Sequence, residues 1–256
     1  MIEQLRAAME VEAQKLVASR VVQSATVLLI VGAAALTGSM AAAANAGNEQ
    51  VLAQLGPLAD VEGWSRVVGV ALQITAAAGL LTFGVVLAWI VGREFGDGTV
   101  NGLFALPVSR PAIILAKLVV FVAWTFVVAI GLVIVVWGVG LAVSDVPPDP
   151  EESRGSLLAR LDVLTVLSGA VAVPAAWVST LGRGVLPGIA STVVTIVVAQ
   201  VMVVSGTGAW FPVAAPALWA FSPSAVSVLQ LGFVALVPVT FGLLATRAWS
   251  RLQLDR

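Results

Sequence analysis

Residues 118–144 read LVVFVAWTFVVAIGLVIVVWGVGLAVS, an unbroken run of 27 residues without a charged side chain. A helix needs about 20 residues to cross the roughly 30 Å hydrocarbon core of a bilayer. This run therefore predicts a transmembrane helix at Leu118–Ser144. The whole chain has the same character, because 59% of its residues are hydrophobic and only 11% are charged. A soluble globular domain carries about 25% charged residues, so that class is excluded.

Outward from this run, the sequence alternates between further apolar segments and short charged ones. Residues 184–246 contain 63 residues without a charge, which is enough for two crossings and a remainder. We therefore predict one all-α domain, residues 1–256, with six transmembrane helices. Besides Leu118–Ser144, the expected spans are Val21–Ala44, Val67–Gly92, Val163–Gly182, Leu186–Ser205 and Ser224–Thr246.

The remainder between the last two expected spans, residues 206–223, is rich in proline and tryptophan. Pro212, Pro216 and Pro223 interrupt helices, and Trp210 and Trp219 favour the membrane–water interface. An external re-entrant hairpin is one interpretation. An ordinary loop that carries an aromatic belt is the other.

Residues 1–18 are expected to form an amphipathic helix that lies along a membrane surface or another protein. Their apolar side chains recur every three or four residues, with charged side chains on other faces; the apolar ones are Ile2, Leu5, Met9, Ala13 and Leu16. The apolar stretch that follows is longer than the 7–15 residues of a secretory signal, so we expect an uncleaved first span. Residues 145–162 are expected to be an acidic external loop, with a short surface helix around Leu157, Leu158 and Leu161.

The orientation follows from the distribution of basic residues, which favour the cytoplasmic side. With six spans and a cytoplasmic N-terminus, only Arg66, Arg154 and Arg160 lie outside. The inner segments hold ten basic residues: Arg6, Lys15, Arg20, Arg93, Arg110, Lys117, Arg183, Arg247, Arg251 and Arg256. This bias predicts a multi-pass membrane protein with both termini in the cytoplasm.

The inner loop after the second expected span, residues 93–111, is the most informative segment. Gly96 and Gly98 release the chain from the preceding helix, and Asp97 can cap a new one. The next residues predict a short helix with one apolar face, formed by Val100, Leu103, Phe104 and Leu106, which Pro107 ends. Ser109 can cap the following helix, and Pro111 fits its first turn. A simple turn is the plainer alternative, although connections of this length are uncommon without a role.

This loop resembles that of the type-2 permeases of ATP-binding-cassette (ABC) transporters, especially the single-domain permeases of bacitracin-type and lantibiotic-immunity exporters. The resemblance covers about 25 residues, and the matching ones are Arg93, Glu94, Asp97, Gly98, Thr99, Leu103, Leu106, Pro107, Val108, Ser109, Arg110 and Lys117. In that family the segment is a cytoplasmic coupling helix that docks on a separate ATPase. The resemblance implies that Arg93, Glu94, Asp97, Gly98, Thr99, Leu103, Phe104, Leu106, Pro107 and Arg110 serve this coupling.

The resemblance also implies two permease copies, identical or similar, and two ATPase subunits. The sequence has no Gly-x-x-x-x-Gly-Lys-Ser/Thr phosphate loop, so we expect ATP and Mg²⁺ to bind the partner ATPase and no cofactor to bind this chain. The absence of cysteine, histidine and tyrosine removes thiol and imidazole chemistry, and no catalysis by this chain alone is expected. A net charge of −1 gives no reason to expect a nucleic-acid partner. Besides the ATPase and the second permease copy, we expect contact with membrane lipid.

The expected spans contain no ionisable residue, and their strongest polar groups are Gln73 and Gln200. A primary amide is costly in lipid, so each should face protein or a cavity. In the family that this chain resembles, the second and fifth spans line the pathway, which makes both residues candidate substrate contacts. Hydrogen bonding between helices is the simpler explanation.

A pathway without fixed charge suits an amphipathic or hydrophobic cargo, such as a peptide antibiotic, a drug or a lipid. An ABC exporter subunit is therefore the expected function. A scaffold or sensor subunit and an ion-coupled secondary carrier are the alternatives, and dependence on an ATPase distinguishes the first from the others.

Overall fold

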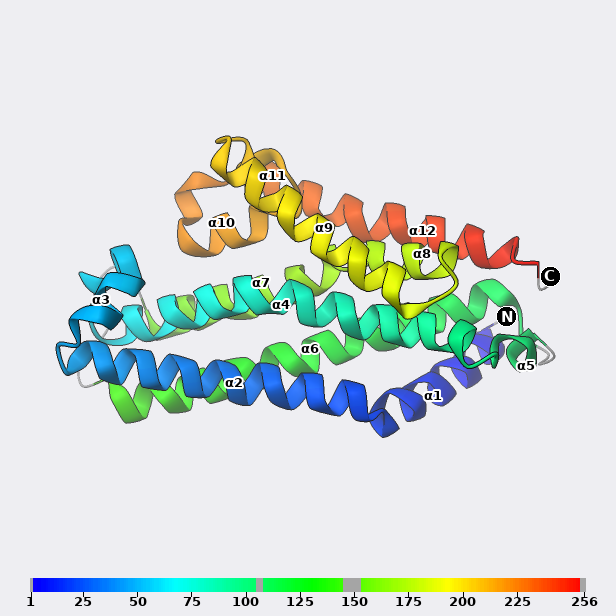
Figure 1. Ribbon diagram of the computed structural model, residues 1–256, viewed down its shortest axis with the longest axis horizontal. Coiled ribbons are helices and arrows are strands. Elements are labelled where there is room, and N and C mark those ends of the chain that lie inside the picture. Colours follow the sequence, from blue (N-terminus) through cyan, green and yellow to red (C-terminus); the bar gives the residue numbers. More distant parts are fainter. Residues whose placement is uncertain (1, 105–107, 145–152, 254–256) are drawn as a thin grey trace.

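The computed structural model describes residues 2–104, 108–144 and 153–253, and these residues form helices, turns and short connections only. The long helices pack side by side along one axis, as Figure 1 shows. The α-helices are α1 (Ile2–Ala18), α2 (Arg20–Asn45), α3 (Glu49–Leu55), α4 (Gly63–Gly96), α5 (Val100–Phe104), α6 (Arg110–Val143), α7 (Arg154–Val171), α8 (Pro174–Leu181), α9 (Val185–Val204), α10 (Ala215–Phe221), α11 (Val228–Gly232) and α12 (Leu236–Ser250). Four short 3₁₀ turns connect them: η1 (Gly56–Ala59), η2 (Gly208–Trp210), η3 (Pro223–Ala225) and η4 (Phe233–Ala235).

Six helical segments in the described part of the chain are long and apolar enough to cross a membrane, which confirms the predicted number of spans. They are Arg20–Asn45, Gly63–Gly96, Arg110–Val143, Arg154–Leu181, Val185–Val204 and Val228–Ser250. Many large apolar side chains on the outer surface are exposed, including Leu28, Val127 and Val194. Such a surface is stable only against lipid or another apolar partner, so this is a multi-pass membrane protein.

Helix α4 is the centre of the bundle and packs against α2, α6, α7, α8 and α9. It approaches α9 closely because glycines stand at their contact. A Cβ on Gly92 would lie 2.5 Å from the backbone of Gly184, and one on Gly188 would lie 2.6 Å from Ala88 Cβ. Small residues of this kind allow helices in a membrane to pack by backbone contact.

The helices are longer than the apolar runs that predicted them. Helix α4 continues through Arg93 and Glu94 to Gly96, and α6 begins at Arg110, before Lys117. The connection between these helices is thus residues 97–109, shorter than the predicted loop of residues 93–111. Glu94 and Lys117, which the prediction placed just outside the second and third spans, are therefore buried residues of α4 and α6.

The acidic segment also differs from its prediction. Residues 145–152 lie outside the described residues, but Arg154–Val171 forms α7, in which Leu157 and Leu161 are fully buried. The expected short surface helix is therefore the first part of the fourth span. That span is interrupted at Ala172 and Val173, because Pro174 has no amide hydrogen to continue the helix.

Residues 206–223 fold back from the end of α9 and lie beside the bundle. A turn at Gly206, with φ of +77°, leads through η2 into α10, which packs against α7 and α4. Ala215 and Ala220 of α10 are fully buried. The segment thus packs against α4 and α7 and is not a free loop. Its insertion into the membrane stays a prediction.

At the same end of the bundle, α3 and η1 form a cap that is fixed by the buried Arg66. Its guanidinium donates hydrogen bonds to Val61 O at 2.6 Å, Asn45 Oδ1 at 2.8 Å and Ala59 O at 3.2 Å. The amide of Asn45 in turn donates to Val143 O at 3.0 Å, which ties α2 to α6.

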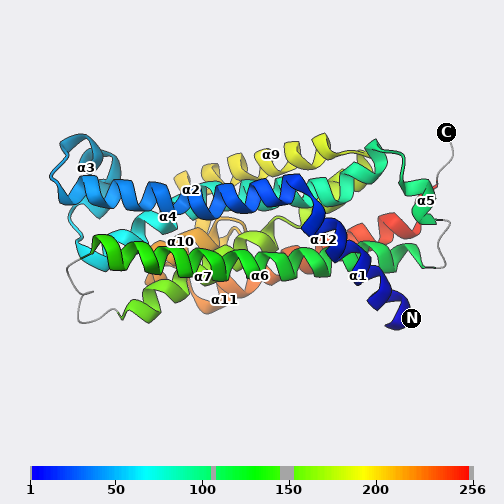
Figure 2. The same cartoon turned by 90° about the horizontal axis from the view of Figure 1, so that it is seen from below.

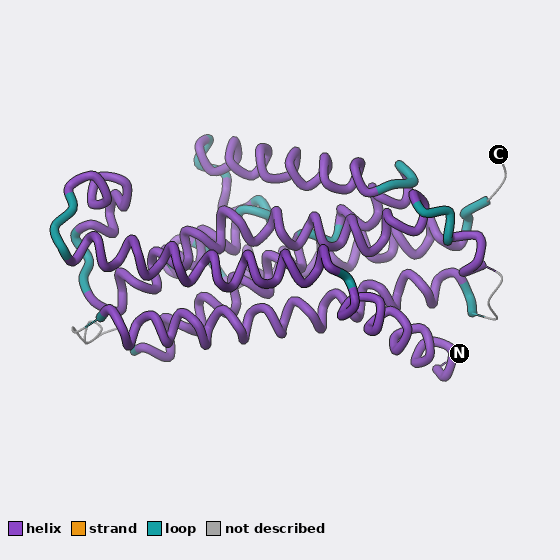
Figure 3. The backbone as a smooth tube through the Cα atoms, turned by 60° about the horizontal axis from the view of Figure 1, so that its bottom comes forward, coloured by secondary structure: helices purple, strands orange, loops and turns teal. Residues whose placement is uncertain are grey.

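The first helix and the end of the last one lie at the opposite end of the bundle, with α5 (Figures 1 and 2). Helix α1 leaves the axis of α2 at Ser19 and packs across α6, a change of direction that Figure 3 also shows. Leu5, Met9, Ala13 and Leu16 are half-buried, whereas Glu3, Arg6 and Glu10 are exposed. Contact of α1 with a membrane surface stays a prediction.

Candidate functional site

The short helix α5 projects from the bundle between the ends of α4 and α6. Asp97 is the C-cap residue of α4 and not, as predicted, the cap of the next helix, because α5 begins only at Val100. Gly98 follows with φ of +67°, a left-handed conformation that glycine adopts without strain. Val100 is buried, whereas Asn101 and Gly102 are exposed, so α5 has one face against the protein and one toward the surroundings. Ser109 and Pro111 stand at the start of α6 as predicted, although Ser109 makes no side-chain hydrogen bond there.

The predicted coupling residues are only partly exposed. Asp97, Gly98 and Thr99 are exposed, and Arg93, Leu103 and Arg110 are half-buried. The structure describes the backbone of Phe104 but not its side chain, and Leu106 and Pro107 lie outside the described residues. The available surface of this segment is therefore the turn at 97–99 together with the outer face of α5.

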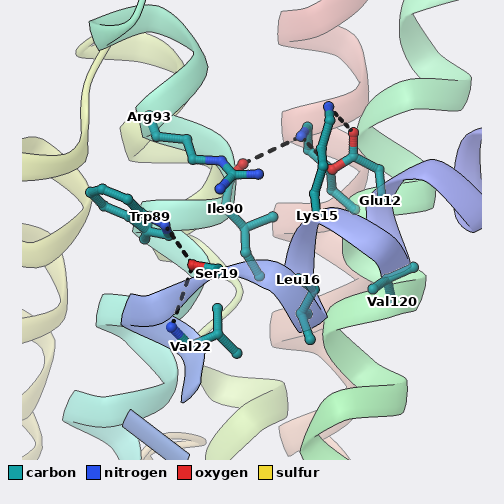
Figure 4. A pocket seen from close by; sticks show the side chains of 10 residues that line it. Glu12, Lys15, Leu16, Ser19, Val22, Trp89, Ile90, Arg93 and Val120 are labelled. Atoms are coloured by element: carbon teal, nitrogen blue, oxygen red, sulfur yellow. Dashed lines mark hydrogen bonds and ion pairs between the residues drawn. The ribbon is translucent and has the colours of Figure 1, made fainter. Parts of the chain in front are cut away.

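Four charged side chains join α1, α4 and α6 beneath α5, and we call Glu12, Lys15, Glu94 and Lys117 the ion-pair network. The ammonium of Lys117 lies 2.7 Å from Glu12 Oε2 and 2.7 Å from Glu94 Oε1. Lys15 lies 2.8 Å from Glu12 Oε1 and 2.9 Å from Glu94 Oε1. Figure 4 shows Glu12 and Lys15 of α1 facing one another, with Trp89 beside Ser19 at the bend between α1 and α2.

The network is neutral in total, and all of its side chains except that of Lys15 are buried. The side chain of Lys117 is 0% exposed, and its third hydrogen bond goes to Ile90 O at 3.3 Å. All three protons of this ammonium therefore have acceptors, which is what a buried lysine requires. Trp89 Nε1 of α4 also donates to Ser19 Oγ at 3.2 Å. This hydrogen bond holds the bend between α1 and α2, and the ion pairs hold α1 itself.

Burial and ion pairing act in opposite directions on the two titratable groups of α1. Burial raises the pKa of the Glu12 carboxyl, but attraction and hydrogen bonding from Lys117 and then Lys15 outweigh it, so that pKa falls below 4.5. Burial lowers the pKa of the Lys15 ammonium, but hydrogen bonding to Glu12 and the charge of Glu94 outweigh it, so that pKa rises above 10.5.

These shifts predict that α1 is held most firmly between about pH 5 and pH 10. A depressed carboxyl pKa stabilises the fold above the unfolded value of 4.5, and this contribution is lost as the pH falls further. A raised lysine pKa stabilises the fold below 10.5 and is lost at higher pH. In thermal unfolding at a series of pH values, Glu12→Gln should be less stable than the native chain at pH 7. The difference should shrink below pH 4.5, and a constant difference would contradict this account.

The position of Glu94 changes its predicted role. Glu94 is 3% exposed, and its Oε1 already binds lysines of α1 and α6. Its carboxylate joins α4 to α1 and to α6. Thr99 Oγ1 donates to the Glu94 carbonyl at 3.4 Å, which links the turn before α5 to the same residue.

The C-terminal segment closes this end of the bundle. Arg110 donates to Leu252 O, and Arg183 Nη2 donates to Gln253 O at 3.2 Å. Trp249 is fully buried, donates to Thr180 Oγ1 at 3.0 Å and stacks edge-on with Phe95 at 6.0 Å. The start of α6, the turn before α9 and the end of α12 are therefore held together beside α5.

The two predicted pathway residues line one cavity. Gln73 of α4 and Gln200 of α9 face a space of about 370 Å³. The other lining residues are apolar: Ala76, Ala77, Leu80, Ile196, Ala199, Val203, Val213, Ala214, Ala217, Leu218 and Phe221. Helix α10 closes one side of it. The sequence identified both amides by their polarity, and the structure brings them together.

Glu12 and Lys15 are the functional residues that the sequence reasoning missed. Their separation of three residues is a recognisable signal for an ion pair on a helix, but their partners lie 79 and 105 residues away in the chain. In the described residues, no group of three or more histidine, cysteine, aspartate or glutamate side chains could hold a metal ion.

The fold and this site define a multi-pass membrane protein whose long helices carry a short projecting helix at one end. Comparison with protein families identifies the class, because the family model of the ABC-2 family transporter proteins matches residues 8–200. The chain therefore belongs to the ABC-2 transporter family and is a membrane subunit of an ABC transporter.

One curated relative is the bacitracin transport permease protein BCRB of Bacillus licheniformis. The two sequences are 34% identical over 53 residues, which are 21% of this chain and 26% of that permease. The chain thus matches about a quarter of the length of this relative.

Proposed function

We propose that this chain forms the membrane pathway of a bacterial exporter that moves an amphipathic or hydrophobic substrate, such as a peptide antibiotic, a drug or a lipid. A separate ATPase subunit, with its own ATP and Mg²⁺, powers the export. A second permease copy, identical or similar, completes the transporter, and both termini lie in the cytoplasm. The observation that carries this proposal is the cavity lined by Gln73 and Gln200.

The chemistry of that cavity supports this substrate class. Its walls are apolar side chains and its polar groups are two neutral amides, each with one acceptor and two donors on a planar group. Among the residues that the structure describes, no charged one lines it. Such a site suits a molecule with a large apolar surface and a few hydrogen-bonding groups, and it gives no compensation for a buried charge.

The cavity lies in one half of the membrane. Gln73 is seven residues after Arg66 in α4, which corresponds to about 10 Å along the helix. Given the proposed orientation, this is the outer half of the bilayer. The segment at residues 206–223 then stands between the cavity and the exterior.

A single helix connects the cavity to the proposed ATPase contact. Helix α4 runs without interruption from Gln73 to Gly96, about 35 Å, and α5 follows after a turn of three residues. A displacement of α5 would therefore tilt α4 as a rod and change the distance between α4 and α9 at the cavity. The ion-pair network makes α1 and α6 part of the same rigid end.

The lateral surface of α9 supports pairing with a second copy. Few residues in the apolar stretch of this helix are buried. Its exposed side chains include Val193, Val194, Val197 and Val201. In a dimer, such a face would pack against the partner near the cavity. Lipid would cover the rest of the apolar surface.

A substitution on the outer face of α5 tests the docking of the ATPase. Asn101 is exposed and projects from the surface, so Asn101→Trp should leave the fold intact and obstruct the contact. We expect co-purification with a co-expressed ABC ATPase partner to fall at least about tenfold, a loss typical of an obstructed hot spot. Gln54→Trp on exposed α3, at the opposite end, is the matched control. Full transport by the isolated chain would overturn the proposal.

The pathway is tested by replacing the two amides. Gln73→Leu and Gln200→Leu keep the approximate size of each side chain and remove its hydrogen-bonding groups, which costs about 1–3 kcal/mol for each substrate contact that is lost. We expect weaker stimulation of the ATPase by a transported peptide or drug, with unchanged ATPase binding. Gln50→Leu, at an exposed position outside the cavity, serves as the control. Unchanged stimulation in both folded variants would mean that these amides only join helices.

A further inference from the structure

A second cavity lies beneath α5, separate from the one lined by the glutamines. It measures about 330 Å³ and is formed by Lys15 of α1, by Arg93 and Glu94 of α4, and by the segment from Asp97 to Leu103. A single water molecule needs only about 10–15 Å³ in the same measure, so this space admits a sizeable polar group.

The cavity lies at the level of the lipid headgroups. Arg66 marks one end of the membrane-crossing part of α4, and Arg93 is 27 residues further along the same helix. At about 1.5 Å per residue this is about 40 Å, which equals the thickness of a bilayer together with its headgroup layers. Trp89, one turn before Arg93, is a residue type that favours this interface.

The charges of the cavity form two groups. Lys15 and Arg93 supply positive charge, and the guanidinium of Arg93 makes no hydrogen bond or ion pair within the part of the chain that the structure describes. Glu94 and Asp97 supply negative charge. Glu94 Oε1 is occupied by two lysines, but its Oε2 is buried and has no hydrogen-bond partner among the described residues.

An unsatisfied buried carboxylate oxygen requires a hydrogen-bond donor, and a half-buried guanidinium requires an anion. A ligand that satisfies both carries an ammonium with N–H groups a short distance from a phosphate. We propose that this cavity binds the headgroup of an ethanolamine phospholipid, with the phosphate on Arg93 and Lys15. The ammonium lies on the exposed carboxylate of Asp97 and beside Glu94, whose buried Oε2 turns toward the cavity to accept its hydrogen bond.

This chemistry distinguishes the ligand from other lipids and from a protein partner. A choline headgroup has the same charges but no N–H to donate to Glu94, and a glycerol headgroup has no cation at all. A basic side chain of an ATPase could pair with Glu94, but it would be a third cation at this carboxylate, after Lys15 and Lys117. It would also leave Arg93 without an anion. The proposal does not depend on the exporter function, because it concerns the isolated chain in either orientation.

The test is lipid binding by the purified full-length chain in detergent. Thermal unfolding is followed by the fluorescence of its eight tryptophans while phosphatidylethanolamine, phosphatidylcholine or phosphatidylglycerol with identical acyl chains is added. We expect half-maximal stabilisation at an ethanolamine lipid concentration about tenfold lower than for choline lipid, the effect of one charge-assisted hydrogen bond. Water-soluble glycerophosphoethanolamine should compete with the ethanolamine lipid, which separates the headgroup from the acyl chains.

Two variants assign the effect to this cavity. Asp97→Asn should reduce the preference for ethanolamine over choline about tenfold, and Arg93→Gln should weaken all three lipids because each has a phosphate. Arg20→Gln and Glu49→Gln, both exposed and outside the cavity, are the matched controls.

Equal stabilisation by ethanolamine and choline lipids would overturn the proposal. So would a preference that both cavity variants retain, since the lipid would then bind elsewhere. If the isolated chain showed no lipid preference and Asp97→Asn weakened only ATPase binding, the cavity would be a socket for a partner's basic side chain and the lipid assignment would be wrong.

Discussion

Replacement of Lys117 by methionine is expected to lower the free energy of unfolding by about 3–5 kcal/mol, the cost of leaving a buried charge without its partner. Lys117 is fully buried and is the only link between α6 and both carboxylates of the ion-pair network among the contacts of the described residues. Without it, Glu12 and Glu94 lie close together with Lys15 alone, whose side chain is 30% exposed. Thermal unfolding in detergent measures the loss.

The same variant should release α1 from α6 before the whole chain unfolds. The native chain has no cysteine, so a single cysteine in place of the half-buried Leu16 reports this directly. Its reaction with a water-soluble maleimide should be faster in Lys117→Met than in the native background.

Two controls separate charge from packing. Lys15→Met should cost less, because Lys15 is partly solvated and Lys117 continues to neutralise both carboxylates. The triple variant Glu12→Gln, Glu94→Gln and Lys117→Met removes all three buried charges of the network. It should therefore recover much of the stability that Lys117→Met loses. If Lys117→Met alone unfolds at the native temperature, the network does not hold α1.

The number of spans was predictable because it depends on composition alone. Long uncharged runs such as residues 118–144 have few alternatives to crossing a membrane, and each of the six expected spans overlaps a helix of the structure. The ends of the helices were not predictable in this way. The prediction ended the second span before Arg93 and began the third after Lys117, whereas hydrogen bonding along the backbone carries α4 and α6 past these charges.

The candidate site was predictable where local chemistry is sufficient. The turn at Gly98 and the start of α6 at Ser109 and Pro111 follow from the conformational preferences of single residues. Gln73 and Gln200 were identified because a primary amide in an apolar run is costly.

The long-range pairings were not predictable from one sequence. The resemblance placed Glu94 in the loop that contacts the ATPase, whereas its burial depends on lysines in two other helices. Likewise, nothing next to Gly92 in the sequence shows that the backbone of Gly184 lies against it. Such contacts are properties of the packed bundle.

That contact gives a second prediction of large effect. Gly92→Ala is expected to separate the start of α9 from α4 and to destabilise the protein by about 1–3 kcal/mol, the usual cost of overpacking. The added Cβ would lie 2.5 Å from both Gly184 C and Val185 N. Backbone atoms cannot rotate away as a flexible side chain does, so the helix itself has to move.

The sign of this change is informative, because alanine is the better helix former and would otherwise stabilise α4 by up to about 1 kcal/mol. Gly138→Ala in α6 measures that contribution, since a Cβ there meets no atom of the described chain within 4 Å. Thermal unfolding should therefore show Gly138→Ala at or above the native stability and Gly92→Ala below it. Because α9 also carries Gln200, a shifted α9 should widen the glutamine-lined cavity and weaken substrate stimulation of the ATPase. Equal stability of the two variants would show that α4 and α9 are not in backbone contact at Gly92.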